Sequence, residues 1–291
     1  EDASQRFNYF VPPNNIAQRK AEDIKRDRLG WGGRWTGSGG LGAEVKGVSE
    51  RYRSDSDTFS NTVLQKQRQA QQRTDHITAQ VDLPPWRRQL WQFGVDLHRE
   101  SLAQSADGSS ELAGGRSKRN SHELFAQNDI LFNDTWELLL GMRWQNDSDF
   151  GSHFAPKASV RARLLDGPDW SSSVRASFGR GYRVPNLKER AFLFDHSSLG
   201  YMVIGNPQLK PESSNSFQLG ADLALRDRFS LELNLFANRV SDLIQIDEDH
   251  ASTVGGITHF TYENVARAQT RGLEALGTWR ARPGLDLRAG Y

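Results

Sequence analysis

The segment 186–205 holds side chains whose types and spacing could bind a ligand. Phe194, His196 and Tyr201 lie close together in the sequence, and Met202 follows them directly. An imidazole with aromatic and thioether neighbours could ligate a haem iron. Equally, a polar or aromatic residue at this position could contact some other small ligand. The segment is therefore a candidate ligand-binding loop.

Four cations cluster just before and within this segment: Arg180, Arg183, Lys188 and Arg190. Guanidinium groups suit carboxylate or catecholate oxygens, so the cluster could recognise an anionic ligand. Contact with membrane phosphates and ordinary solvated charge are the alternatives. The candidate ligand-binding residues are thus Arg183, Arg190, Phe194, His196 and Tyr201.

Prolines bound the same segment. Pro185 has no N–H to donate and is expected to end a strand ladder. The dipeptides Asn206-Pro207 and Lys210-Pro211 favour an extended path that returns to the next strand. Together they would fix both ends of a loop over 186–213. A loop whose ends are fixed can hold its side chains in constant positions toward a ligand. The alternative is that they form boundary turns without ligand contact.

No pattern of catalytic residues is recognisable. Residues 37–40 (Gly-Ser-Gly-Gly) lack the Lys-Ser/Thr of a phosphate-binding loop, and no Gly-x-Ser-x-Gly elbow occurs. The chain has no cysteine, which excludes disulfides, zinc fingers and a thiol nucleophile. Residues 247–250 (Asp-Glu-Asp-His) could hold a hard cation, but their spacing matches no calcium loop and indicates a solvated tip. We therefore expect that the protein is not an enzyme and that it uses no cofactor.

The amino-acid composition narrows the class of protein to which the chain can belong. The 291 residues include 37 Lys and Arg against 36 Asp and Glu, so a nucleic-acid partner is not expected. The longest apolar run, Leu138 to Leu140, is far below the roughly 18 residues of a spanning helix. A β-barrel wall needs only alternate apolar residues, and the 26 Gly, 15 Phe, 8 Trp and 6 Tyr suit one.

Hydrophobicity alternates with a period of two along most of the chain, which predicts strands. The alternating stretches lie at 91–97, 136–144, 158–164, 174–178, 217–225, 229–235, 273–281 and 285–291. Including their flanks they run about 9–11 residues, the length of a tilted transmembrane strand. Aromatic residues such as Trp136 and Trp279 often end the apolar face, as in interfacial girdles.

Short and long connections alternate between these stretches. Short turns are expected at 84–88, 132–135, 166–169, 226–228 and 282–284, and long loops at 51–73, 100–120, 145–157, 181–213 and 247–259. This is the pattern of a barrel with short periplasmic turns and long outer loops. Residues 17–27 are expected to form a charged helical turn or a loop.

Several segments, in order and at suitable spacing, resemble TonB-dependent outer-membrane receptors. Phe178–Glu189 (FGRGYRVPNLKE) resembles their F-x-x-x-[FY]-[RK]-x-P-x-L-x-E segment, and Gly205–Glu212 (GNPQLKPE) their G-N-P-x-L-K-P-E segment. Tyr262–Val265 followed by Arg271–Glu274 is similar to their Y-x-N … R-G-x-E strand pair. Leu124–Asp129 and Leu140–Trp144 are compatible with their wall strands. The resemblance covers roughly 74–291.

The resemblance implies an all-β, antiparallel transmembrane β-barrel in the bacterial cell outer membrane, seen in part: about 12 of an expected 22 or so strands. The whole of 1–291 would be barrel, with the plug domain and C-terminal strands not present in this chain. The implied function is TonB-coupled uptake of a scarce ligand, most simply a ferric siderophore. Haem, bound through His196, is the alternative ligand.

The implied partners are that ligand, the TonB complex acting through the plug, and outer-membrane lipid and lipopolysaccharide. Two other classes stay open. A passive porin would share the strands but lack the Gly-Asn-Pro-x-Leu-Lys-Pro-Glu and Arg-Gly-x-Glu segments. A soluble β-sandwich binding module would have shorter strands.

Overall fold

The computed structural model describes residues 1–11, 16–112, 116–196, 200–226 and 228–291. Their strands form one 16-stranded sheet. Its long strands are β1 (Asp2–Val11), β2 (Ile16–Thr36), β3 (Gly42–Ser60), β4 (Val63–Asp82), β5 (Gln89–Ala106), β7 (Ser117–Leu131), β8 (Trp136–Asp147), β9 (Gly151–Asp166), β10 (Trp170–Arg183), β13 (Glu212–Leu225), β14 (Phe229–Val254) and β15 (Ile257–Arg282). The shorter elements are η1 (Ser38–Gly40), β6 (Ser109–Ser110), α1 (Leu187–Ala191), β11 (Leu193–His196), β12 (Tyr201–Ile204) and β16 (Leu285–Gly290).

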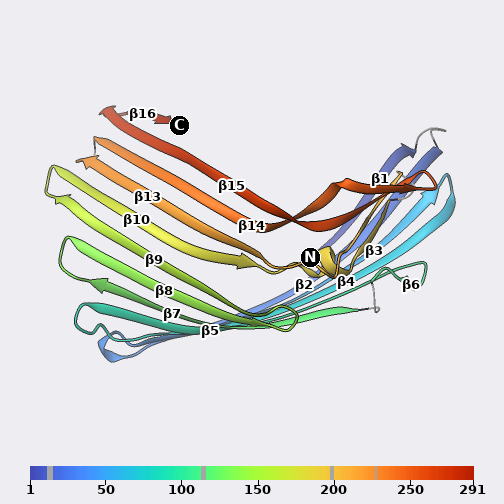
Figure 1. Ribbon diagram of the computed structural model, residues 1–291, viewed down its shortest axis with the longest axis horizontal. Coiled ribbons are helices and arrows are strands. Elements are labelled where there is room, and N and C mark those ends of the chain that lie inside the picture. Colours follow the sequence, from blue (N-terminus) through green and yellow to red (C-terminus); the bar gives the residue numbers. More distant parts are fainter. Residues whose placement is uncertain (12–15, 113–115, 197–199, 227) are drawn as a thin grey trace.

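The long strands form an antiparallel meander, because each pairs with the next long strand along the chain (Figure 1). The order runs from β1 to β15, and β16 pairs with β15. Within the described residues no ladder joins β1 to the far end, so the sheet is an open, curved wall. This confirms the expected all-β antiparallel fold. Among the described residues the twelve long strands match the expected 12 or so, and the other four strands of the sheet are short.

One surface of the wall is a continuous apolar band. Val160, Ala176, Leu219, Leu235 and Leu273 occupy successive cross-strand positions from β9 to β15. Between 38% and 48% of the surface of Leu219, Leu235 and Leu273 is exposed. Exposing so large a continuous apolar surface to water would be energetically unfavourable. Strand alternation sends the intervening residues, such as Gln218, to the opposite, polar face. The band is the lipid-facing surface of a transmembrane wall.

No helix in the described ranges is both long enough and apolar enough to cross a bilayer.

The expected short turns are present, but most of the expected long loops are strands. Residues 51–73 belong to the β3–β4 hairpin, which reverses at 61–62, and residues 17–27 are part of β2. Here both faces carry polar side chains, so the period-two signal vanishes while the backbone ladder continues. These extensions project beyond the apolar band, where water solvates both faces.

Three other expected loops are also shorter than predicted. β8 and β9 reverse between Asp147 and Gly151, and β14 and β15 reverse at Gly255 and Gly256, where both φ angles are positive (60° and 81°). β5 reverses into β6 at Asp107 and Gly108 (φ 50° and 78°), within the expected loop 100–120. These are the left-handed conformations that tight hairpin turns require.

The connection between β10 and β13 is long, as predicted. Its described parts, 184–196 and 200–211, are here called the strap. α1 packs Leu187, only 1% exposed, against Leu102 of β5 and Leu112 in the buried apolar cluster of the chain. The hairpin β11–β12 then pairs in parallel with β15 through residues 201–204 and 258–261. The strap is therefore held by strands far apart in the sheet.

Candidate ligand-binding site

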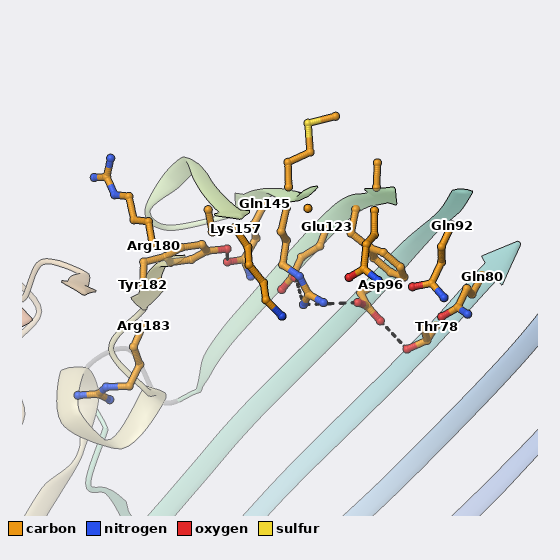
Figure 2. A pocket seen from close by; sticks show the side chains of 18 of the residues that line it. Thr78, Gln80, Gln92, Asp96, Glu123, Gln145, Lys157, Arg180, Tyr182 and Arg183 are labelled. Carbon is orange, nitrogen blue, oxygen red and sulfur yellow. Dashed lines mark hydrogen bonds and ion pairs between the residues drawn. The ribbon is translucent and has the colours of Figure 1, made fainter. Parts of the chain in front are cut away.

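An open concavity of about 1030 Å³ lies on the polar face of the wall. Its lining comes chiefly from β4, β5, β7, β8, β9 and β10, and Figure 2 shows it from close by. The size suits a ligand of several hundred daltons, since small-molecule sites commonly measure about 300–1,000 Å³. The last residues of β10, where the strap begins, form one side of it.

Asp96 of β5 organises one side of the concavity. Its carboxylate accepts a hydrogen bond from the Thr78 hydroxyl, lies 3.2 Å from Nε2 of His76 and lies 3.7 Å from Nη1 of Arg143. The same Arg143 nitrogen is 2.7 Å from Glu123. These links join β4, β5, β7 and β8 across the polar face (Figure 2). They hold the charged groups in fixed positions, which is a condition for selective binding.

Donors beside this cluster remain available to a ligand. Lys157 of β9 extends into the concavity and makes no ion pair with any described residue (Figure 2). Tyr182 is not one of these free donors, because its hydroxyl donates to Gln145 and its ring stacks on His153 with 4.7 Å between ring centroids. Gln127 also lines the site. Amide and ammonium donors on a concave wall can receive the oxygens of an anionic or polyhydroxylated ligand.

The base of the strap is closed by a charged cluster. Arg183 donates to both carboxylate oxygens of Glu212, at 2.5 and 2.9 Å, and also to Glu189 of α1 at 3.0 Å. The backbone N–H of Ile244 donates to Glu212 at 2.8 Å. Bonds from Arg183 lower the pKa of Glu212, more than burial raises it, and the Ile244 N–H adds to the lowering. All four groups lie beyond the apolar band.

Two further contacts fix the start of the strap. Asn186 caps α1 reciprocally with Glu189: the Asn186 side chain accepts from the Glu189 N–H, and the Glu189 carboxylate accepts from the Asn186 N–H, each at 2.8 Å. Arg119 of β7 donates to the Pro185 carbonyl at 3.1 Å and to Glu100 at 3.0 Å. The strap is thus docked onto both neighbouring strands and more distant ones.

The structure brings three of the five candidate residues together. On the β11–β12 hairpin the rings of Phe194 and His196 lie 4.1 Å apart, and His196 stacks on Tyr201 at 5.3 Å. Tyr201 in turn meets Phe260 of β15 edge-on at 6.4 Å. His196 is partly buried within this aromatic row. An imidazole held in this way could serve as an axial ligand to haem iron.

Arg183 and Arg190 lie apart from that row, and of the two only Arg183 lines the concavity. The Arg183 head group is occupied by Glu189 and Glu212, and Figure 2 shows it directed away from the concavity. Arg190 pairs with Asp149 in the β8–β9 turn and covers the Phe150 ring at 4.9 Å. The geometry thus gives both arginines a role in holding the strap.

Among the described residues, one group has potential metal-ligand geometry. Asp247, His250 and Glu263 present ligand atoms within 4.8 Å of one another on the outer β14–β15 hairpin. Asp247 already accepts from the His250 backbone N–H at 3.0 Å and contacts its Nδ1 at 2.9 Å. The contacts between Asp247 and His250 stabilise a bulge in β14, where the register shifts between Asp247 and Ser252. This bulge accounts for the closeness of the ligand atoms without a metal ion.

Sequence reasoning missed the residues of the concavity. Asp96 and Arg143 alternate with apolar residues on predicted strands, so their polar face was accessible from the pattern, whereas Glu123 lies outside the predicted stretches and Lys157 ends the predicted loop 145–157. The convergence of the four side chains was not accessible, because it depends on strand register and sheet curvature. The alternation identified the polar face of the sheet, and the three-dimensional fold decides which residues of that face line the concavity.

Comparisons with known proteins identify relatives of the chain. Residues 2–291 match the family model described as TonB dependent receptor-like, beta-barrel. The iron-regulated outer membrane virulence protein of Vibrio cholerae is 24% identical over 312 aligned positions, covering 99% of this chain and 47% of that protein. The chain therefore spans about half the length of this relative.

Solved structures share the fold. The siderophore receptor PirA from Pseudomonas aeruginosa aligns with a TM-score of 0.70 and 18% identity, over 100% of this chain and 62% of that one. The hemophore receptor HasR of Serratia marcescens, solved with its hemophore HasA and heme, aligns with a TM-score of 0.74 and 15% identity, over 100% and 53%. At these identities the likeness establishes the fold alone.

Proposed function

The chain belongs to the family of TonB-dependent receptor β-barrels of the outer membrane. On that premise we propose that it forms part of the barrel wall and the outer opening of a receptor that takes up a ferric siderophore. The concavity carries the proposal, because it places the ammonium group of Lys157, which pairs with no described carboxylate, beside fixed polar groups at the start of the strap. Ferric siderophores are often anionic, and such donors suit their oxygens.

The receptor would also need parts that this chain does not show. The chain matches 47% of its Vibrio cholerae relative. We propose that a plug domain and further wall strands complete the working receptor, and that the TonB complex acts through that plug. The structural neighbours PirA and HasR are named as receptors, which supports binding and gating over bond-making chemistry.

Ligand titration of the full-length receptor that contains this chain tests the proposal. Tryptophan fluorescence quenching would be followed with ferric tricatecholate, ferric carboxylate and ferric hydroxamate siderophores. We expect an anionic complex to bind, and Lys157→Gln to weaken its binding about tenfold. Lys210→Gln, an exposed lysine outside the concavity, is the matched control. Failure of all three complexes to bind would contradict the proposal.

Haem is the second candidate, and the aromatic row of Phe194, His196 and Tyr201 favours it. HasR, a structural neighbour, was solved with a hemophore and heme. If haem is the ligand, titration with haemin gives a shifted Soret band that His196→Ala abolishes. His122→Ala, which removes an exposed histidine on the outer face of β7, should leave it unchanged. A Soret spectrum identical in both variants would exclude His196 as the ligand.

A further inference from the structure

One arginine both lines the concavity and holds the base of the strap. Arg119 of β7 has a side chain that is 11% exposed, and its Nη1 donates to the Pro185 carbonyl at 3.1 Å. We propose that Arg119 is a positioning residue with two alternative partners, Pro185 and Asp147, and that the partner it takes links the occupancy of the concavity to the docking of the strap. The link to a ligand rests on the proposed function of the concavity.

Two buried polar atoms at this place have no hydrogen-bond partner within the described part of the chain. They are Nε of Arg119 and Oδ2 of Asp147. The two atoms lie 3.8 Å apart, beyond the roughly 3.2 Å limit of an N–H···O hydrogen bond. The Asp147 side chain is 0% exposed, so water does not reach its carboxylate. A buried charged oxygen without a hydrogen bond is costly, and this cost favours any movement that closes the gap.

The other contacts of the two residues hold the gap open. The Oδ1 atom of Asp147 accepts from the Asp149 backbone N–H at 2.9 Å, which fixes the carboxylate at the end of β8. Arg119 is held by Pro185 and by Glu100, to which its Nη2 donates at 3.0 Å. The guanidinium is planar and rigid, so its nitrogens move together. In this arrangement it satisfies the strap and leaves Asp147 without its hydrogen bond.

A second arrangement exchanges the partners. When the guanidinium moves to Asp147, it gains a hydrogen bond to a buried carboxylate and loses the one to the neutral Pro185 carbonyl. Hydrogen bonds to charged groups are roughly twice as strong as those between neutral groups, which favours the exchange. Pro185 and Leu187 are each under 2% exposed, and their burial favours the docked strap. These opposing contributions keep both arrangements accessible, which is the condition for a two-state element.

A ligand in the concavity acts on this equilibrium. Val184, directly before Pro185, lines the same concavity as Arg119, so the ligand and the base of the strap lie beside each other. An anionic ligand adds a negative charge there that competes with Asp147 for the guanidinium. It therefore favours the arrangement in which Arg119 stays with Pro185. By linkage, a docked strap raises the affinity for that ligand by the same factor.

Hydrogen exchange of peptides from 184–193, in the full-length receptor that contains this chain, tests the equilibrium without a ligand. Asp147→Asn removes the charge that competes for Arg119, so exchange should slow about threefold. A carboxylate that merely supports Arg119 would give the opposite result, because its loss would loosen the strap. Asp222→Asn is the matched control, since it alters a lumenal carboxylate 3.7 Å from Arg175 and outside the concavity. Faster or unchanged exchange in Asp147→Asn would overturn the proposal.

Two further variants keep this test decisive. In a receptor that carries Arg119→Gln, the added change Asp147→Asn should not alter strap exchange, because the residue on which it acts is gone. If Asp147→Asn does not fold, Asp147→Glu decides. Its longer side chain brings the carboxylate closer to Arg119 and draws the guanidinium from Pro185, so exchange should accelerate about threefold. Slower or unchanged exchange in the Glu variant would contradict the two-partner equilibrium.

A second measurement adds the ligand. The probe is the anionic ferric complex, tricatecholate or carboxylate, that binds more tightly in the fluorescence titration, at a concentration that saturates each variant. We expect it to slow exchange of 184–193 about threefold in the unaltered receptor and to have no effect in Arg119→Gln. Equal slowing in both would show that the strap responds without Arg119 and would overturn the coupling. If no complex binds, the proposed function fails, whereas the Asp147 variants still decide whether Arg119 has two partners.

Discussion

Arg183 and Glu212 are directly opposite each other at the ends of β10 and β13, and they join the two feet of the strap through a bidentate ion pair. The Arg183 side chain is 44% exposed, so solvent screens part of the attraction. Glu212 is 10% exposed and also accepts from the Ile244 N–H, which makes it costly to leave unpaired. The pair thus makes the position of the strap depend on two residues outside it.

Arg183→Lys should therefore loosen the strap without unfolding the wall. Lysine keeps the charge but cannot make both hydrogen bonds, and we expect a local cost of about 1 kcal/mol. Hydrogen exchange of peptides from 186–211 should accelerate about fivefold, while β13 beyond its first turn stays protected. Arg88→Lys, which alters an exposed pair with Asp134 at the other rim, serves as control. Unchanged exchange in the strap would show that Arg183 does not hold it.

Leu187→Ala should release the strap more strongly. Leu187 is 1% exposed and packs against Leu102 and Leu112, so its truncation leaves a cavity costing about 2–5 kcal/mol of local stability. We expect chymotrypsin, which cleaves after aromatic residues such as Phe192, Phe194 and Tyr201, to cut the strap in this variant under conditions that leave the original receptor intact. Lys188→Ala, on the exposed side of the same helix, should retain resistance. A protected strap in the Leu187 variant would mean that α1 is not its anchor.

The strands of the wall could be predicted because the alternation of apolar and polar residues that marks them is a local property of the sequence. Alternation at 217–225 or 273–281 reflects lipid on one face and water on the other, and the structure has strands there. The same rule misassigned 51–73, because water on both faces of the β3–β4 extension erases the alternation. Turn chemistry offered the missing signal: Asp107-Gly108 and Gly255-Gly256 are hairpin pairs.

The candidate site was only partly accessible to the same reasoning. His196 and Tyr201 could be grouped because they are close in sequence, and the hairpin stacks them. Arg183 and Arg190 could be listed as cations, but their carboxylate partners come from α1, β13 and a distant turn. Ion pairing across the fold decides whether a cation can meet a ligand, and no local pattern encodes it.

Acidification should loosen the outer β14–β15 hairpin. Burial disfavours the ionised Asp247 carboxylate, but hydrogen bonds from the backbone and ring of His250 favour it more, so the pKa of Asp247 lies below its usual range. A depressed pKa contributes stability above the unfolded value, about 3.9, and that contribution is lost as the pH falls through the folded value. This hairpin lies beyond the apolar band.

We expect hydrogen exchange at 244–259, corrected for intrinsic rates, to show lost protection only at or below about pH 3–4. Asp247→Asn should remove this acid step, because its amide does not titrate. Glu263 also faces the group, so an acid step that persists in the Asn variant would assign the effect to Glu263 and contradict the role of Asp247.

Leu219 and Gln218 are adjacent on β13 but face lipid and lumen respectively, and this gives the sharpest test of the wall. Leu219 pairs with Ala176 and Leu235 in the apolar band, whereas Gln218 pairs with Ser177 and Phe236 on the opposite face. A lysine on the lipid face near the bilayer middle costs about 2–4 kcal/mol, while a lumenal lysine stays hydrated. Leu219→Lys should therefore lower the folding yield into bilayers, measured by heat-modifiable gel migration, and Gln218→Lys should not. The reverse order would place the apolar band on the inside and overturn the orientation that puts the concavity on the lumenal face of the wall.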